Sequence, residues 1–294
     1  ALTLVHLENA DIPRAGGKML RPALCLMAAG ALGARDLKRF VQMGAAFECL
    51  HIASLAHDDV IDRALLRRGN ASLTGLWDNH AAVLGGDYLV ARAVETLAEY
   101  DSCAVIANAI RSVRCMAEGE LFFFGRDPER VTREDCIMLA EQKTASLFAE
   151  ACAGPSFVLD ATHRDALHAF GIGLGIAFQL VDDTLDVTRT SEALGKPACG
   201  DVVEGKQTLP IMYLRESLDA AGRARLVAMR DADLSDDDRA WVIEQALRTG
   251  AGQRALDDAR AFVDDAIAAL RQLPESPYTQ SMEGVAEFVL VRGH

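Results

Sequence analysis

The chain has 294 residues, and its 43 acidic and 30 basic side chains give a formal net charge of −13. Because nucleic-acid binders rely on Lys and Arg to neutralise phosphates, this charge argues against a nucleic-acid partner. Hydrophobic residues make up 50% of the chain and aromatic residues only 6%, a balance that with abundant Ala and Leu favours packed helices.

One domain over residues 1–294 is the simplest organisation, because no Gly/Ser-rich or Pro-rich linker divides the chain. The seven cysteines include no CxxC pair, which is typical of reduced thiols in the cytoplasm. The two longest runs without a charged residue or a histidine have 13 residues each, whereas a membrane span needs roughly 20. We therefore expect a cytoplasmic protein without a transmembrane segment or a signal peptide.

The segment "AGGKMLRP", residues 15–22, sets Lys18 and Arg21 at the predicted start of a helix. Glycines let backbone N–H groups approach an anion, and a helix N-terminus attracts one. The segment is not a Walker-type loop, which requires GxxxxGK[ST] after a strand. It predicts a phosphate site if metal ligands for a diphosphate lie nearby.

The middle of the segment 40–62 would be apolar on nearly all sides of a helix, which is typical of a helix buried in a bundle. This helix leads into "HDDVIDRALLRRG", where Asp58, Asp59 and Asp62 form the first acidic motif. Asp58 and Asp62 fall one turn apart on one face, so they repel each other unless a cation lies between them. The structural alternative is a solvated helix end, closed by the basic residues and the glycine at 67–69.

Three further helices are predicted at 87–100, 106–123 and 134–153, and no alternating run predicts a strand. Lys143 and Thr144 lie in the last of these, where spacing alone favours a surface lysine. His51 lies two turns before Asp58, and a lone histidine there is more typical of a core residue than of a ligand. We expect an all-α bundle of about ten or more helices around a central cavity.

The stretch "QLVDDTLD", residues 179–186, repeats the spacing of the first motif, and we call Asp182, Asp183 and Asp186 the second acidic motif. Three glycines at 171, 173 and 175 precede it, and they indicate close helix packing or a nearby ligand because glycine weakens a helix. Aspartates at 257–258, 264–265 and 236–238 lack the third carboxylate. We interpret them as solvated helix faces.

A turn-rich connection at 194–210 carries Lys196, Asp201 and Lys206, and loops of that length between helices are often functional. With DDxxDxxxxRRG, QxxDDxxD and the GGK segment in this order, the chain resembles the trans-isoprenyl diphosphate synthases (polyprenyl synthetases). It is most like long-chain members such as octaprenyl diphosphate synthase. The resemblance runs from Gly16 nearly to the C-terminus and implies the all-α isoprenoid synthase fold, a homodimer and dependence on magnesium.

The resemblance also implies roles for the residues at matching positions. The carboxylates that would bind magnesium, about three ions per site, are Asp58, Asp62 and Asp182, supported directly or through water by Asp59, Asp183, Asp186 and Asp201. The basic residues that would bind an allylic diphosphate are Arg67, Lys143, Lys196 and Lys206. Those that would bind the diphosphate of isopentenyl diphosphate are Lys18, Arg21, His51 and Arg68. The residues near the developing carbocation would be Thr144 and Gln179.

The implied reaction begins with ionisation of the allylic C–O bond, and metal and lysine charge stabilise the departing diphosphate. The carbocation then alkylates the double bond of isopentenyl diphosphate, and the released diphosphate removes a proton, so no protein nucleophile is needed. The chain departs from the family pattern at two places. Met19 replaces a basic residue after GGK, and Cys199 replaces a glycine that is displaced to Gly200. At the second place we expect a local change in backbone conformation and retained activity.

Product length in this family depends on a tunnel beside the first acidic helix, which bulky residues four and five positions before Asp58 block early. Here those positions are occupied by the small residues Ser54 and Ala53, which lie about 6 to 7.5 Å before Asp58 along the helix. We therefore expect a product longer than geranylgeranyl, with delivery at a membrane surface as an open possibility. Three aromatic residues could instead close the tunnel or simply pack in the core: Phe122, Phe123 and Phe124.

Other functions are weighed against the synthase. They are a short-chain (farnesyl or geranylgeranyl) diphosphate synthase, an HD-type metal phosphohydrolase suggested by His57 and Asp58, a terpene cyclase, and a non-catalytic subunit of a heteromeric synthase. The phosphohydrolase leaves the second acidic motif unexplained, and a cyclase should not need Lys18 and Arg21. A non-catalytic subunit can lose its metal ligands, whereas both acidic motifs are complete here.

Overall fold

The computed structural model describes residues 18–62, 66–67, 70–71, 78–123, 127–159 and 162–292. The elements of the first half are α2 (Leu20–Ala31), η1 (Leu37–Phe40), α3 (Val41–Ile61), β1 (Leu66–Arg67), β2 (Asn70–Ala71), α5 (Asn79–Ala98), α6 (Cys103–Phe123), η2 (Pro128–Arg130), α7 (Arg133–Ala140), the π-helix η3 (Glu141–Ala145), α8 (Ser146–Ala153) and η4 (Gly154–Phe157). Those of the second half are α9 (Arg164–Thr188), α10 (Ser191–Leu194), α11 (Gly200–Val203), α12 (Leu209–Ser217), α13 (Ala220–Ala228), α14 (Asp236–Thr249), α15 (Ala251–Leu270) and α16 (Pro277–Val291). The expected all-α fold is confirmed.

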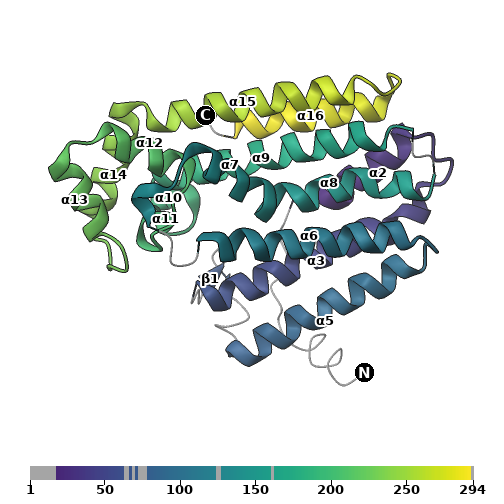
Figure 1. Ribbon diagram of the computed structural model, residues 1–294, viewed down its shortest axis with the longest axis horizontal. Helices are drawn as coiled ribbons and strands as arrows, with labels where there is room; N and C mark the ends of the chain where they lie inside the picture. Colours follow the sequence, from purple (N-terminus) through teal and green to yellow (C-terminus); the bar gives the residue numbers. More distant parts are fainter. Residues whose placement is uncertain are drawn as a thin grey trace.

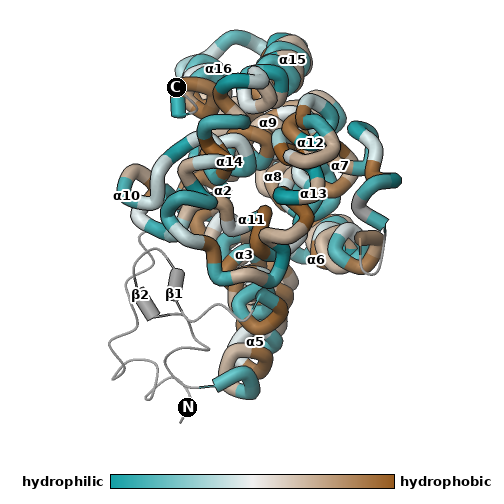
Figure 2. Tube along the Cα trace, turned by 90° about the vertical axis from the view of Figure 1, so that its left-hand side faces the viewer, coloured by the Kyte–Doolittle hydropathy of each residue, from teal (hydrophilic) through white to brown (hydrophobic). Residues whose placement is uncertain are grey.

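The helices are stacked in layers with α9 near the middle. Figures 1 and 2 both show α15 and α16 on one side, α9 with α8 and α2 next, then α3 and α6, and α5 at the opposite edge. Helices α12, α13 and α14 gather at one end of the bundle (Figure 1). The larger hydrophobic core forms around α9, with Phe148, Leu174 and Val263 buried in it. A second core cluster lies along α3, around Phe47 and Leu50.

The glycines of α9 allow its neighbours to approach closely. A Cβ atom added at Gly171 or Gly175 would lie less than 3.0 Å from the backbone of Ala149 or Ala145, respectively. One added at Gly173 would lie 2.7 Å from a carbonyl oxygen of α15. The prediction of close helix packing at these glycines is confirmed, and the second acidic motif therefore lies on a helix that is fixed from two sides.

Helix boundaries differ from the sequence prediction in three places. α3 ends at Ile61, with Asp62 as its C-cap, and residues 66–67 and 70–71 pair as a short antiparallel ladder. The structural alternative of a helix end at 67–69 is therefore wrong, and the two-residue ladder was not predicted. α5 begins at Asn79 rather than at 87, because the Asp78 carboxylate accepts from the Ala81 N–H at 2.8 Å and caps it. The helix predicted over 134–153 is interrupted by η3.

Most of the aspartates without a third carboxylate are solvated, as predicted. Asp264 and Asp265 are exposed, and Asp236 to Asp238 form the first turn of α14, where negative charge suits the helix dipole. Asp258 is the exception and corrects the prediction. Its carboxylate accepts from the Tyr213 hydroxyl at 2.6 Å and from Arg133 at 2.5 Å, and its side chain is only 18% exposed.

Within the described ranges, no helix combines the length and the apolar character that a membrane crossing requires. All seven cysteines are free thiols, and four of them are buried. The expectation of one domain over residues 1–294 stays a prediction.

Candidate active site

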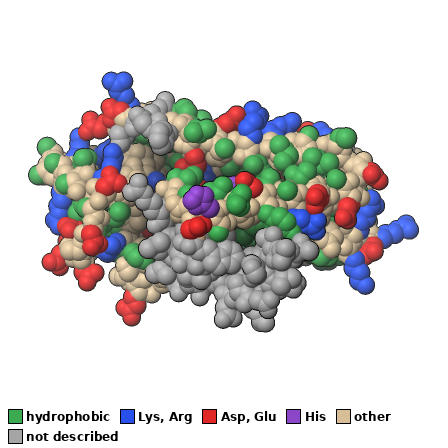
Figure 3. Space-filling view, turned by 90° about the horizontal axis from the view of Figure 1, so that it is seen from below, with side chains coloured by type: hydrophobic (Ala, Val, Ile, Leu, Met, Phe, Trp, Pro, Cys, Tyr) green, Lys and Arg blue, Asp and Glu red, His purple; other side chains and the backbone are tan. Residues whose placement is uncertain are grey.

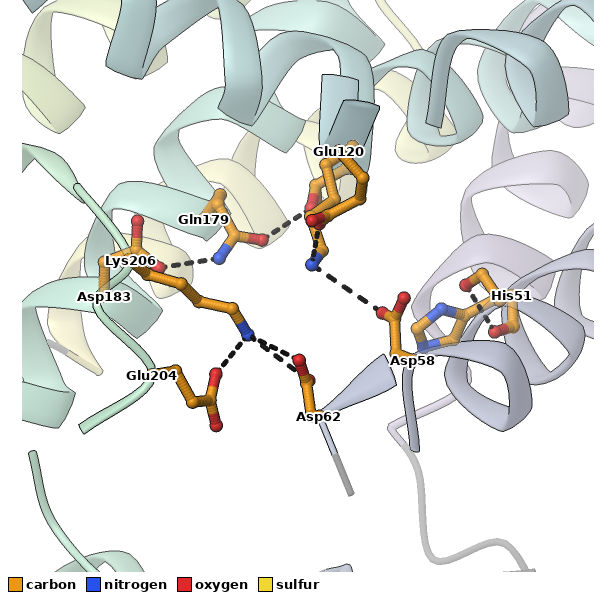
Figure 4. A network of polar contacts seen from close by, with 11 residues as sticks. His51, Asp58, Asp62, Glu120, Gln179, Asp183, Glu204 and Lys206 are labelled. Atoms are coloured by element: carbon orange, nitrogen blue, oxygen red, sulfur yellow. Dashed lines mark hydrogen bonds and ion pairs between the residues drawn. The ribbon is translucent and has the colours of Figure 1, made fainter. Parts of the chain in front are cut away.

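The end of α3 presents two carboxylates to two lysines from other parts of the chain. The Lys143 ammonium lies 3.7 Å from Asp58 Oδ2, and the Lys206 ammonium lies 3.3 Å from both oxygens of Asp62. Each lysine also contacts a glutamate: Lys143 pairs with Glu120 of α6, and Lys206 pairs with Glu204. Figure 4 shows Asp58 and Asp62 facing Lys206, Glu120 and Gln179 across one space.

The second acidic motif lies near the end of α9, where carboxylates crowd together. Burial raises the pKa of Asp183 to about 7, although a hydrogen bond from Gln179 Nε2 at 2.7 Å opposes this, and its neighbours Asp182 and Asp186 raise it further. Burial and Asp186 also raise the pKa of Asp201 well above its ordinary value. This cluster carries more negative charge than the surrounding basic residues offset.

The two acidic motifs interact with the same lysine. Burial raises the pKa of both Asp58 and Asp183, and the Lys143 charge lowers it. Burial lowers the pKa of Lys206, whereas the carboxylates of Glu204, Asp62 and Asp201 raise it. Residues from α3 and α9, 124 positions apart at the start of each motif, thus lie close to one ammonium group, that of Lys143.

The carboxylates fit the donor set that a hard divalent cation prefers. Asp186 Oδ1 is buried without a hydrogen-bond donor and lies 3.4 Å from the Lys196 ammonium, while its Oδ2 accepts from the Asp201 N–H at 3.0 Å. Oxygen ligands and an excess of negative charge suit magnesium. Among the described residues, no group of three or more His, Cys, Asp and Glu side chains is arranged to hold an ion by itself.

The π-helix η3 carries Lys143 and Thr144 into the site. Thr144 is buried, and its hydroxyl donates to Gln179 Oε1 at 2.5 Å. The Gln179 amide nitrogen in turn donates to Asp183. Lys143 is only 25% exposed, so the surface position that spacing favoured is wrong. A π-turn shifts the register of the following side chains and is frequent at functional sites. Helical periodicity alone cannot reveal it.

Two basic residues of the GGK segment lie at the start of α2, with Lys18 just before the helix and Arg21 in its first turn. The Arg21 guanidinium is buried over the Phe148 ring at 4.4 Å, and the Lys18 ammonium lies 5.1 Å from the Phe288 ring of α16. The Lys18 charge also lowers the pKa of Asp182, although burial raises it overall. The backbone at Met19 is left-handed, with φ of 48°, and forms the N-cap of α2.

Other predicted site residues have mixed outcomes. His51 lies on α3 near Asp58 (Figure 4), and its carbonyl accepts from the Ser54 hydroxyl at 2.8 Å. Asp59 is buried at 3% exposure. Arg67 lies in β1, but its side chain is outside the described residues, as are all of Arg68 and Phe124.

The residues proposed to set product length lie on α3 and α6. Ala53 is buried, and Ser54 is partly buried one position further along α3. Phe122 is 37% exposed, whereas Phe123 packs against the larger core, and their rings meet edge to face at 5.2 Å. Their effect on product length stays a prediction.

The Cys199 position departs from the family pattern, and the segment around it contacts the second acidic motif. Cys199 has φ of 61°, in the left-handed region that favours glycine, and its N–H donates to the Asp186 carbonyl at 2.9 Å. The next N–H but one, that of Asp201, reaches the Asp186 carboxylate. The segment therefore still connects Lys196 and Asp201 to the second acidic motif.

Sequence inspection missed three charged residues of the site. Glu120 and Glu204 pair with the two lysines, and Arg292 pairs with Asp182 from a position 110 residues away while its guanidinium covers the Phe178 ring at 4.6 Å. Arg292 Nη1 is buried without a hydrogen-bond partner. None of the three belongs to a motif, so only the fold brings them to the site.

His57 does not face the carboxylates. Its Nε2 lies 3.4 Å from Asp87 and 3.3 Å from the Val83 carbonyl, and its ring covers Gly86, all on α5. An HD-type phosphohydrolase needs the histidine and the following aspartate at one metal. The orientation of His57 argues against that function.

Comparison with known proteins agrees with this geometry. A family model described as "Polyprenyl synthetase" matches residues 7–254. The all-trans-nonaprenyl-diphosphate synthase (geranyl-diphosphate specific) of Rhodobacter capsulatus is 33% identical over 293 residues, covering 99% of this chain and 90% of the relative. A polyprenyl synthase from Caulobacter crescentus CB15, solved with calcium and isoprenyl diphosphate, superposes with a TM-score of 0.89 at 34% identity, covering 95% and 86% of the two chains. A geranylgeranyl pyrophosphate synthetase from Pyrococcus horikoshii Ot3 gives 0.83 at 30% identity, covering 95% and 87%.

The helical bundle with two facing acidic motifs, taken with these similarities, defines a prenyltransferase. The chain belongs to the polyprenyl synthetase family.

Proposed function

We propose that this protein is a magnesium-dependent trans-prenyltransferase that condenses isopentenyl diphosphate with an allylic diphosphate and releases a polyprenyl diphosphate longer than geranylgeranyl. The observation that carries the proposal is that both acidic motifs interact with Lys143, while Lys206 links Asp62 of the first motif to Asp201 beside the second. The similarity to a nonaprenyl and to octaprenyl diphosphate synthases supports the long-chain product. The fold alone does not decide length, since a geranylgeranyl synthase shares it.

The carboxylates proposed to hold magnesium are Asp58, Asp62 and Asp182, with Asp183 and Asp186 in support. Magnesium commonly binds through one or two carboxylates together with substrate phosphates, so a diphosphate would complete its ligands. Bound there, it would supply positive charge to the leaving diphosphate.

The chain's own residues then bind and orient the substrates. Lys143 and Lys206, which are already charged and partly buried, are placed to donate to the allylic diphosphate, together with Lys196. Charge-assisted contacts of this kind stabilise a departing diphosphate most where water is excluded. Lys18, Arg21 and His51 would bind isopentenyl diphosphate, with Arg67 and Arg68 as further members of the two sites.

The pair of Thr144 and Gln179 is proposed to lie beside the carbocation. The Thr144 hydroxyl donates to Gln179 Oε1, and the Gln179 amide donates to Asp183, so the orientation of both side chains is fixed. Their oxygen dipoles would face positive charge without reacting with it. The released diphosphate would remove the proton, as the family resemblance implies.

The direct test is incubation of the purified protein with isopentenyl diphosphate, farnesyl diphosphate and magnesium, followed by chromatography of the products. We expect products longer than geranylgeranyl, and we expect a chelator such as EDTA to abolish turnover. Full turnover in EDTA would refute the metal site. Release of inorganic phosphate without elongation would favour a phosphohydrolase instead.

Product length should respond to the small residue at position 53. Ala53 is 1% exposed on α3, and a phenylalanine there would fill space beside the helix. We expect Ala53→Phe to shorten the products toward farnesyl or geranylgeranyl, while Ala46→Phe, equally buried two turns earlier on α3, serves as the control for general overpacking. An unchanged length distribution in Ala53→Phe would contradict the proposed tunnel.

We also propose a homodimer and a cytoplasmic location. The free thiols support the location, and apolar side chains on the face that contains α5 support the dimer (Figure 3). The exposed apolar residues on α5 and α6 include Val83, Leu84, Ile110 and Leu121. Delivery of the product at a membrane surface stays a prediction from the sequence.

A further inference from the structure

A groove of about 660 Å³ lies between η2, the start of α7, α12, α13 and α15. Its charged lining consists of four arginines and two glutamates, namely Arg133, Arg215, Arg223, Arg254, Glu129 and Glu216, and we call it the arginine groove. Its lining contains none of the residues assigned to metal or substrate in the proposed active site. The arginine groove is therefore a separate feature that prenyl transfer does not explain.

The charge of the arginine groove opposes that of the whole protein. The lining residues alone sum to 4 − 2 = +2, whereas the chain has a formal net charge of −13. Arg133 also pairs with Asp258 and Glu134, and Arg254 pairs with Glu216. Like charges that converge on one concave surface repel each other and raise the local concentration of anions. A surface with this charge on an acidic protein needs a reason beyond solubility.

Two of the guanidinium groups are held in fixed positions. Arg133 donates to Asp258 at 2.5 Å and to the Tyr213 hydroxyl at 3.2 Å, and that hydroxyl donates to Asp258 at 2.6 Å. The Arg254 guanidinium lies over the Tyr213 ring, 3.8 Å from its centroid, and donates to Glu216 at 3.4 Å. A guanidinium that is already ordered loses less conformational entropy when it binds a ligand.

The other two arginines are also held by hydrogen bonds. Arg215 Nη1 donates to Gln207 Oε1 at 2.8 Å, and Arg223 Nε donates to the Leu218 carbonyl at 2.9 Å. Within the part of the chain that the structure describes, no carboxylate lies at ion-pair distance from Arg223. Arg223 therefore lines the groove without an ion-pair partner among the described residues.

Size and chemistry together indicate the ligand. Planar guanidinium groups match phosphate oxygens with paired N–H donors, and a groove of this volume falls in the range of small-molecule sites. Val131 and Met212 add apolar surface to the lining. We propose that the arginine groove is a second anion site, which binds a small organic molecule bearing a phosphate or diphosphate group.

The test is calorimetric titration of inorganic pyrophosphate into the full chain in EDTA. We expect the wild type to show one more binding site than the Arg223→Ala/Arg254→Ala variant, or at least tenfold tighter binding at that site. The matched control is Arg92→Ala/Arg271→Ala, which removes the same charge from two exposed arginines in ordinary surface ion pairs. It should titrate like the wild type. Identical isotherms for the wild type and the groove variant would overturn the proposal.

A second variant separates lost binding from lost structure. Glu129→Gln/Glu216→Gln removes negative charge from the same groove, so it should bind pyrophosphate several-fold more tightly, a gain that misfolding cannot produce. Unchanged or weaker binding would count against the site. Co-sedimentation with phosphatidylglycerol vesicles distinguishes the two sources of phosphate. If the wild type sediments with the vesicles and the arginine variant does not, the ligand is a lipid headgroup. If the wild type binds pyrophosphate but stays in the supernatant, the ligand is a free phosphorylated molecule. These readouts do not depend on prenyl transfer.

Discussion

In the presence of a chelator, Asp183→Asn should resist urea better than the wild type. In magnesium, it should turn over substrate on the order of 10²- to 10³-fold more slowly than the wild type. Asp183 shares its surroundings with Asp182 and Asp186, and burial raises its pKa to about 7. An asparagine keeps an oxygen that can accept from Gln179 and removes the buried charge. Activity falls because the proposed metal site loses a carboxylate.

The stability gain should depend on pH in a definite direction. The folded-state pKa of Asp183 lies above its unfolded value, so the folded wild type binds more protons between about pH 4 and pH 7 and loses stability as the pH rises through that range. Above about pH 7 the full cost is present, about 2–4 kcal/mol. The variant lacks this term, so its advantage should be small at pH 4 and largest at pH 8.

The measurement is urea unfolding of both proteins in EDTA at pH 4, 6 and 8, with turnover measured separately in magnesium. Asp264→Asn is the matched control, because Asp264 begins an aspartate doublet on α15 but is exposed. It should change neither quantity by much. An advantage of Asp183→Asn that stays constant with pH, or a wild type that is more stable at pH 8, would contradict the crowding of carboxylates on α9.

The sequence predicted the parts of the site that are local in the chain. Asp58 and Asp62, or Asp182 and Asp186, share a helix face because of their spacing, so their positions follow from helical geometry alone. Arg292 reaches Asp182 across 110 residues, and no local pattern encodes such a contact. Lys143 was expected at the surface because helical periodicity was assumed to continue through residues 141–145, where the backbone is a π-helix.

The fold was predicted well as a class and less well in its details. Composition and apolar periodicity were enough for an all-α bundle, since each helix buries one face. The end of α3 was predicted to within one residue, whereas the alternative end at 67–69 failed because basic residues and a glycine there imitate a helix terminus. Asp258 was misplaced for a related reason: helical spacing identifies the face of α15 on which it lies, but not that Arg133 and Tyr213 from α7 and α12 cover that face.

Gly175→Ala should both destabilise the protein and slow the reaction. An added Cβ would lie less than 3.0 Å from the Cα and Cβ atoms of Ala145, which belong to η3 rather than to a flexible side chain. Either α9 or η3 must move, at a cost of about 3 kcal/mol. Because Lys143 and Thr144 directly precede Ala145, we also expect a loss of turnover on the order of tenfold to a hundredfold.

The same substitution at Gly284 provides the control. Gly284 lies in α16 with no atom within 4 Å of an added Cβ, so Gly284→Ala should stabilise the protein by about 0.5–1 kcal/mol through helix propensity and leave turnover unchanged. Thermal unfolding and steady-state turnover of both variants measure the difference. If Gly175→Ala were as stable and as active as Gly284→Ala, then α9 and η3 would not be in close contact, and the packing that positions Lys143 against Asp58 would have to be reconsidered.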